Sequence, residues 1–412
     1  MGYSAARGGL DAILAAEELM RAKRDGGSSP ALGIDQLTER LNLAVDRVMG
    51  EAGLWAPQFA ALALRQAEGD IIEAAHLLRA YRSTRMRLAE PVTVHADELE
   101  ILRRIVPAYR VPPGPQLLGR TLDYVGRLLE VADARSGPRP ADPPALAGPE
   151  PSAPPPEAPE LPELPELPKL PAASAAATAQ TVRHPGRLLD LLRSQGMIRD
   201  RRRPDDPEPH DVTRDPVRPG VPRSARLSVM ARAETGALVN LWYRNVLGPD
   251  GYIHEVTLGE VRHGRLPVRV MHPVTLQPVC LGAVRVTEVE AIEDLDGADE
   301  ERGLFDVGYG LCLGHNERKA IAMANLDIAV ERDGGRSSLE QSVLMTTDGL
   351  DASGFLEHLK LPHYVTFRSM VDRKAAIRAA ARQRAAQAAD QASEASEAGQ
   401  TSAAGTAAAV NR

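Results

Sequence analysis

The sequence predicts an α+β protein in which a helical N-terminal part precedes a strand-rich C-terminal part. Apolar residues follow helical spacing over residues 9–130, whereas they alternate with a two-residue period in short runs over 227–286. A proline-rich segment separates the two patterns. The changes of pattern place a helical domain at 1–133, a Pro/Ala-rich linker at 134–182, an α+β domain at 183–372 and an Ala/Gln-rich tail at 373–412.

The N-terminal part is expected to be helical up to about residue 130. Its clearest amphipathic stripe has apolar residues three and four positions apart: Ile34, Leu37, Leu41, Val45 and Val48. Asp70 followed by Glu73 fits the aspartate form of the capping box, which predicts a helix running toward Tyr81. The prolines at 112–115 interrupt the pattern before a further apolar helix at 117–129.

The linker is defined by its prolines. Fourteen of the 33 prolines lie between Pro138 and Pro171, and many of them recur at every third position. This period matches the three-residue turn of polyproline II, so we expect a semi-rigid extended spacer. A ligand for a proline-binding module is the less favoured alternative.

The C-terminal part alternates strands and helices. Beyond a short helix at 187–194 that Gly196 closes, alternating apolar residues predict strands at 227–231, 237–243, 268–270 and 284–286. A further strand at 311–313 leads to Asn316, whose side chain can cap a helix that runs to about Val330. From Arg373 onward the tail predicts a frayed helix followed by disorder.

Composition excludes several classes of protein. A net charge of −7 argues against a general nucleic-acid binder, and Cys280 and Cys312 are too far apart to suggest a zinc ribbon. No apolar run approaches the ~20 residues that span a bilayer. The N-terminus lacks the basic and apolar regions of a signal peptide. We therefore expect a cytoplasmic protein that binds neither membrane nor nucleic acid.

Arginines in the helical part are the first candidates for substrate binding. Arg79 and Arg82 begin a run of four arginines at near-helical spacing, and the planar guanidinium suits phosphate oxygens. A solvated helix face explains the same run. Arg47 stands within an apolar helix pattern, so it needs a partner, which either Asp46 or a bound anion supplies.

A second candidate is the segment 308–319, which combines a strand, a glycine-bearing turn and a helix start. Such a helix start offers free backbone N–H groups to an anion, with Asn316 as cap and with Arg318 and Lys319 adding positive charge. The segment lacks the Walker A string, and close packing explains its glycines equally well. His315 in this segment, like His95, is expected at the surface.

Two histidines near the C-terminus form the third candidate. His358 and His363 lie five positions apart, which on a continuous helix is about 140° around the axis. Pro362 ends a helix at that point, so the chain can turn His363 back toward His358. Two neutral imidazoles beside a fixed bend make half of a metal site. Two surface histidines at a helix end are the alternative.

Residues 354–367, GFLEHLKLPHYVTF, resemble the C-terminal signature of the PhnI family, the I subunit of the bacterial carbon–phosphorus lyase core complex. Further blocks resemble the family in the same order over most of residues 1–130 and 183–370. They are an N-terminal Gly8-Gly9 before a helix, the segments 41–49 and 67–82, Thr213–Pro216, and 308–320.

The resemblance implies a reaction. The family's I subunit, with the G and H subunits and the ATPase-like L subunit, attaches a phosphonate to C1 of the ribose of a nucleoside triphosphate and releases adenine. Alone it is a nucleosidase acting on ATP or GTP. The resemblance and the basic patterns together make Arg47, Arg79, Arg82, Asn316, Arg318 and Lys319 the candidate substrate-binding residues.

The resemblance also implies a metal and an assembly. His358 and His363 match the family's paired zinc-site histidines at the boundary with the iron–sulfur J subunit, in a two-fold symmetric complex. Two ligands are fewer than zinc usually takes, so the partner, water or substrate would supply the others. A non-catalytic scaffold completing a metal site of the J subunit remains an alternative. A self-contained metal hydrolase is disfavoured because no third ligand lies near the pair in the sequence.

Overall fold

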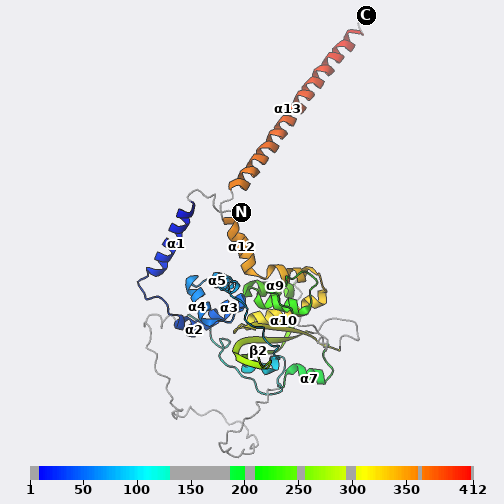
Figure 1. Cartoon of the computed structure of the whole chain (residues 1–412). Helices are drawn as coiled ribbons and strands as arrows, with labels where there is room; N and C mark the ends of the chain where they lie inside the picture. Colours follow the sequence, from blue (N-terminus) through cyan, green and yellow to red (C-terminus); the bar gives the residue numbers. More distant parts are fainter. Residues whose placement is uncertain are drawn as a thin grey trace, which may run out of the picture.

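The computed structural model describes residues 9–129, 186–199, 209–247, 256–293, 303–360 and 364–409. A unit of short helices packs beside a four-stranded sheet and its covering helices (Figure 1), which confirms the α+β class. The linker predicted at 134–182 lies outside the described residues, as does His363.

The helical unit contains α1 (Gly9–Asp25), α2 (Ile34–Arg40), α3 (Asn42–Ala52), α4 (Pro57–Gln66) and α5 (Ile71–Ser83). The last four bury a common apolar core that includes Leu37, Val48, Met49, Leu64 and Leu78. The predicted cap of α5 is confirmed, because the Asp70 carboxylate accepts from the backbone N–H groups of Ile72 and Glu73. α1 buries none of its residues and lies away from this core.

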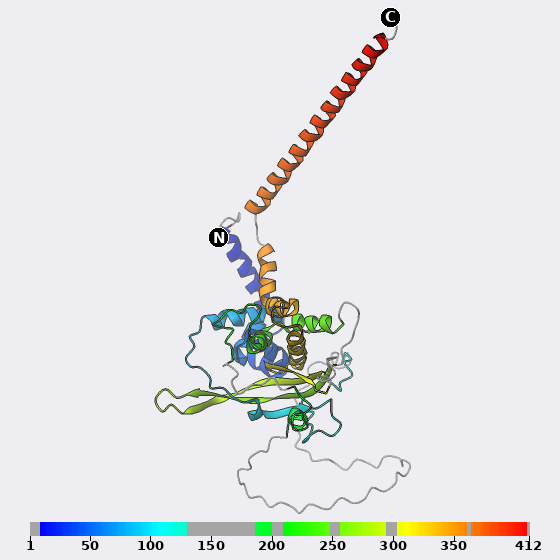
Figure 2. The same cartoon turned by 90° about the vertical axis from the view of Figure 1, so that its right-hand side faces the viewer.

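The sheet consists of antiparallel strands in the order β1 (Glu100–Ile105), β2 (Val256–Met271), β3 (Pro278–Glu293) and β4 (Asp306–Leu313). It confirms the strands expected at 268–270, 284–286 and 311–313. β2 and β3 pair along almost their whole length, and the far end of their hairpin projects from the body of the molecule (Figure 2).

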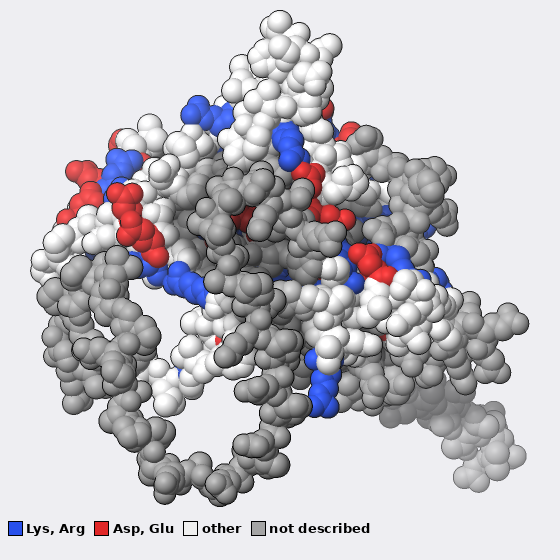
Figure 3. Space-filling view, turned by 90° about the horizontal axis from the view of Figure 1, so that it is seen from below, with Lys and Arg blue, Asp and Glu red and all other residues white. Residues whose placement is uncertain are grey.

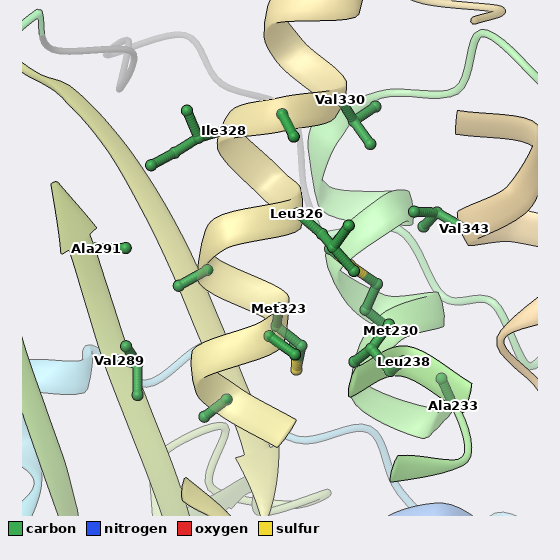
Figure 4. Packing of buried hydrophobic residues seen from close by; sticks show 14 of the residues in the cluster. Met230, Ala233, Leu238, Val289, Ala291, Met323, Leu326, Ile328, Val330 and Val343 are labelled. Carbon is green, nitrogen blue, oxygen red and sulfur yellow. The ribbon is translucent and has the colours of Figure 1, made fainter. Parts of the chain in front are cut away.

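Helices cover both faces of the sheet. One face carries α10 (Glu317–Asp333), and over it lie α8 (Arg223–Arg232), α9 (Thr235–Leu247) and α11 (Ser338–Thr346), followed by α12 (Gly349–Lys360). Leu326 of α10 points toward Met230 and Leu238, while Met323 lies between the sheet and these helices (Figure 4). α7 (Leu188–Ser194) packs into a smaller apolar cluster with Val106 and Ile292.

The glycines of β4 allow α10 to approach the sheet closely. A Cβ on Gly308 would lie 1.9 Å from the carbonyl oxygen of Ala324, and one on Gly310 would lie 2.2 Å from that of Ala320. No side chain fits at such distances. Of the two explanations that the sequence left open for these glycines, packing against α10 accounts for Gly308 and Gly310.

Four predictions of secondary structure were wrong. The runs at 227–231 and 237–243 are the helices α8 and α9, not strands. Residues 100–105 form β1, so the helical pattern does not continue to residue 130, and the expected helix at 117–129 is absent from this described segment. Leu117 instead makes an isolated antiparallel bridge with Arg104, and Leu128 and Leu129 are exposed.

The tail forms one long helix, α13 (Tyr364–Ala409), which extends away from the body (Figures 1 and 2). The helix that was expected in the tail is therefore present, and it runs further than a frayed end would. No described helix combines the length and apolarity needed to cross a membrane.

Candidate functional site

The helical unit and the sheet unit meet at a polar junction formed by α3, α5, the α8–α9 turn and the starts of α10 and α12. Its centre is Glu51, whose side chain is fully buried. Oε1 of Glu51 accepts from Arg47 Nε at 2.8 Å and from the hydroxyl of Thr235 at 2.8 Å. Asn316 Nδ2 donates to the same hydroxyl at 2.9 Å, and Arg47 Nη2 donates to Glu234 Oε1 at 2.6 Å.

The structure thus brings the two candidate regions together. Arg47 and Asn316 are joined through Glu51 and Thr235, although they lie on opposite sides of the linker in the sequence. The sequence predicted that Arg47 needs a partner, either Asp46 or a bound anion. The structure gives it two carboxylate partners, Glu51 and Glu234, and neither is Asp46. Asp46 instead pairs with Arg285 of β3.

Arg79 uses its guanidinium to tie four elements together. Nε and Nη2 donate to the backbone carbonyl of Glu51 at 3.1 and 2.8 Å. Nη2 also donates to the backbone carbonyl of Arg232 at 3.0 Å, and Nη1 forms an ion pair with Asp348 at 2.8 Å. All three nitrogens are engaged by protein groups. Arg79 therefore has a structural role at the junction, because no nitrogen of its guanidinium is left without a protein partner.

Arg82 and Arg232 are different, because neither forms an ion pair with a described carboxylate. Both are half-buried. Burial, and then the neighbouring Arg79, lowers the pKa of Arg82, while burial, then Arg82 and Arg79, lowers the pKa of Arg232. Arg232 Nε is buried without a hydrogen-bond partner in the described chain. This crowding of guanidinium groups is the arrangement that an anion would relieve.

Gly53 holds the two guanidinium groups together. Its φ of +64° is in the left-handed region, and its carbonyl accepts from Arg82 Nη1 at 3.2 Å. A Cβ on Gly53 would lie 3.0 Å from Arg82 Nη1 and 3.3 Å from Arg232 Nε. The absence of a side chain therefore lets both arginines occupy the same corner. We call Arg82, Arg232 and Gly53 the arginine corner.

The start of α10 contributes the remaining candidates. Asn316 caps α10 as predicted, with Oδ1 accepting from the Lys319 backbone N–H at 3.2 Å. Lys319 itself is 1% exposed, and its Nζ has no hydrogen-bond partner in the described chain. Burial lowers the pKa of this ammonium group, and Glu51, Arg79 and Asp348 are among the charges near it. Arg318, by contrast, is exposed.

A pair of histidines, which the sequence did not indicate, lies on the other side of Asn316. The rings of His263 and His315 stack with centroids 4.2 Å apart and planes inclined by 15°. Burial, and then His315, lowers the pKa of His263 to about 4, so this ring is neutral at neutral pH. His315 is therefore not a simple surface residue, and Nε2 of its ring lies 3.7 Å from Glu317 Oε1. Its partner, His263, lies on β2 and is therefore distant from His315 in the sequence.

A second charged cluster covers the face of the sheet opposite α10. Arg104 pairs with Glu260, Arg187 pairs with Glu288 and Glu290, and Arg262 pairs with Glu288. Burial, and then Glu288, raises the pKa of Glu290 to about 7. These groups are nearly all buried, and each arginine is paired with a glutamate, so we assign them a structural role rather than a role in binding. On the face seen from below, acidic and basic side chains also lie close together (Figure 3).

The structure describes one of the two candidate metal ligands. His358 is exposed in the last turn of α12, while His363 lies outside the described residues. Within the described ranges no group of three or more His, Cys, Asp or Glu side chains is arranged to hold a metal ion. Both the pairing of His358 with His363 and the source of the other ligands stay predictions.

Comparison with known proteins decides the family. Residues 2–381 match the model of the family described as bacterial phosphonate metabolism protein (PhnI). The chain belongs to the PhnI family. The junction residues Arg47, Arg79, Arg82, Arg232 and Asn316 all lie within the matched region, and so does the histidine stack.

Relatives cover nearly all of the PhnI-family chain. A putative C-P lyase subunit protein HtxH of Stutzerimonas stutzeri is 38% identical over 90% of this chain and 95% of its own length. Two proteins named alpha-D-ribose 1-methylphosphonate 5-triphosphate synthase subunit PhnI are similar to it. That of Rhizobium meliloti is 36% identical over 90% of this chain and 93% of the relative, and that of Escherichia coli is 35% identical over 90% and 96%.

Proposed function

We propose that this PhnI-family chain is a carbon–phosphorus lyase subunit in phosphonate catabolism, and that with partner subunits it transfers the ribose triphosphate of ATP to an alkylphosphonate and releases adenine. The family match and the synthase-subunit names of two relatives support the proposal. Acting alone, the chain would be a nucleosidase that removes the base from ATP or GTP.

The arginine corner is the observation that carries the proposal. ATP has about four negative charges, and the chain has a net charge of −7, so ATP needs a local cluster of cations. Arg82 and Arg232 lie beside each other on Gly53 and lack described carboxylate partners. A triphosphate would supply the missing anion. Arg79 and Arg47 would then stabilise the elements around the corner rather than bind ATP, since their own guanidinium groups already bind protein groups.

The reaction assigns three tasks to the protein. The bond from ribose C1 to the purine nitrogen breaks with its electron pair going to the base, and a phosphonate oxygen forms the new bond to C1. That oxygen is already anionic, so it needs positioning rather than activation. Positive character develops on the ribose, and the departing base needs a proton.

We further propose that His358 and His363 hold zinc together with a partner subunit. Two imidazoles are fewer than the three or four ligands that zinc takes from proteins, so a partner chain, water or substrate would complete the site. The partners in this proposal are the G, H and J subunits, with the L subunit acting functionally, in a two-fold symmetric assembly.

A non-catalytic scaffold is the second candidate function. Its support is that Arg47 and Arg79 each bind groups of both units, so the junction also joins the two halves of the chain. In that case the reacting groups would belong to the partner subunits, and His358 would complete a neighbour's metal site.

The experiment is adenine release by the co-purified complex, measured by chromatography with ATP, with and without methylphosphonate. We expect release to rise with methylphosphonate, and we expect Arg232→Gln in this chain to reduce it. A complex that releases adenine equally well with Arg82→Gln or Arg232→Gln would favour the scaffold. Intact assembly without any adenine release by the wild type would refute the transfer reaction.

A further inference from the structure

His315 and Glu317 form an imidazole–carboxylate pair that the proposed binding of ATP does not use. Nε2 of His315 lies 3.7 Å from Glu317 Oε1, and the same carboxylate oxygen accepts from Arg103 Nε. Burial on its own would raise the pKa of Glu317, but the contacts with His315 and Arg103 outweigh burial and lower that pKa to about 2. Glu317 therefore remains an anion facing the imidazole at any physiological pH.

His315 is held in place through both its ring and its backbone. Its face stacks on His263, which is 6% exposed, and its backbone N–H donates to Asp46 Oδ2 at 2.9 Å. His263 is itself fixed, because Nδ1 lies 3.2 Å from Thr287 Oγ1. The Thr287 hydroxyl already donates to the Gly314 carbonyl at 2.7 Å, so the proton between Thr287 and His263 belongs to the imidazole.

The second ring nitrogen of His315 is available. Nδ1 makes no hydrogen bond to a group in the described parts of the chain, and the side chain keeps 19% of its exposure. An imidazole oriented by a carboxylate on one nitrogen and free on the other is the arrangement that proteins use for proton transfer. His315 can thus give a proton to a ligand, while Glu317 stabilises the charged ring.

The pair and the arginine corner both contact α3 and its C-terminal cap. Asp46, which binds the His315 backbone, and Gly53, which underlies the corner, both belong to the region of α3 and its C-terminal cap. They are seven residues apart, which is about 10 Å along a helix axis. An elongated ligand with its triphosphate in the corner could therefore present its other end near His315.

We propose that His315 donates the proton that the purine takes up as it leaves the ribose, with His263 and Glu317 as positioning residues. The inference rests on the proposed function. In this step the proton moves from His315 Nδ1 to a ring nitrogen of the base as the C1–N bond breaks and its electron pair goes to the base. The resulting neutral imidazole regains its proton from water before the next turnover.

Several charged groups set the protonation of His315. Glu317 on α10 and Asp46 on α3 favour the charged ring, while Arg103 on β1 and Arg285 on β3 oppose it, and His263 on β2 is the stacked neighbour. An imidazole must carry both of its ring protons to donate one and remain neutral, so the rate with ATP should fall toward alkaline pH.

The test compares two leaving groups in the co-purified complex. One substrate is ATP, whose adenine needs a proton, and the other is the 4-nitrophenyl riboside 5-triphosphate, whose nitrophenolate leaves without one. We expect His315→Asn to reduce kcat with ATP by about 100-fold or more, and to change kcat with the nitrophenyl substrate by only a few-fold. The alkaline limb of the ATP profile should disappear in the same variant.

Glu317→Gln should reduce kcat with ATP more than kcat with the nitrophenyl substrate, because the neutral amide no longer stabilises the charged ring. His76→Asn, on the exposed side of α5, is the matched control and should change neither substrate. Equal losses with both leaving groups, or full activity of His315→Asn with ATP, would overturn the assignment of His315. A wild-type complex inactive with both substrates would instead contradict the proposed function.

Discussion

Arg79 and Asp348 lie 269 positions apart in the chain, and Arg79 Nη1 donates to Asp348 Oδ2 at 2.8 Å. The same guanidinium also donates to two backbone carbonyls, those of Glu51 and Arg232. One side chain thereby fastens α5 to α3, to the end of α8 and to the start of α12. The arginine corner is built on this connection, because Arg82 follows one turn later and Arg232 supplies one of the carbonyls.

Arg79→Ala should therefore lower stability. The substitution leaves a partly buried carboxylate and two carbonyls without their donor, which should cost about 2–3 kcal/mol of the free energy of unfolding. Urea unfolding of the full-length chain measures it. Arg40→Ala, at an exposed position in α2, is the control and should stay within about 0.5 kcal/mol of the wild type. An unchanged Arg79→Ala variant would show that the junction is not held by this residue.

Gly53→Ala should disturb ATP binding as well as stability. The left-handed backbone opposes any side chain, which costs about 1 kcal/mol, and the new Cβ would push apart Arg82 and Arg232. The KM for ATP should rise several-fold. Gly69→Ala is the matched control, since its φ is +94° but nothing lies within 4 Å of its Cβ. It should lose similar stability while keeping the KM, and equal KM values in both variants would argue against the corner.

His263 should make the fold sensitive to acid. Its pKa is about 4 in the folded protein against about 6.5 in an unfolded chain. Between these values the unfolded chain binds a proton that the native state does not, so stability is full above the upper value and falls as the pH falls through the window. His263→Gln keeps a donor toward Thr287 but does not titrate. Its loss of stability from about pH 7.5 to about pH 5 should be smaller than that of the wild type. Equal losses would contradict the buried neutral imidazole.

The sequence predicted elements well where one period dominated. Val268, Val270, Val284 and Val286 belong to the long hairpin, and the Asp70 and Asn316 caps were confirmed. The prediction failed in α8 and α9, where Leu227 and Ala231 fit a two-residue period and a four-residue one equally. The Glu234 carboxylate settles the choice, because it accepts from the N–H groups of Gly236 and Ala237 at the start of α9.

The site could be predicted only in part. The sequence alone identified the arginines and Lys319 as candidate cations. The network that joins Arg47, Glu51 and Asn316 depends on tertiary structure, which the sequence does not display. Arg232 was missed because nothing in the pattern of α8 distinguishes it. His263 was missed for a similar reason, since its partner His315 is 52 positions away on another element. The only signal that the sequence offered for His263 was a histidine at a strand position whose side chain faces inward.

The zinc prediction can be tested through the described histidine. His358→Ala should lower the zinc content of the assembled complex, since zinc favours imidazole ligands held in fixed geometry, while assembly is kept. Metal analysis of the purified complex measures this. His76→Ala removes an exposed histidine from α5 and should retain the wild-type zinc content. Full zinc occupancy in His358→Ala would remove this residue from the site.

The most direct test of the central claim is the KM of the complex for ATP compared with that for adenosine, in the wild type and in Arg82→Gln and Arg232→Gln. Only ATP carries the triphosphate that the arginine corner is proposed to hold. Losing one charged donor should raise the KM for ATP by about tenfold or more and leave that for adenosine unchanged. Equal changes for both substrates, or none for either, would contradict a triphosphate site at Arg82 and Arg232.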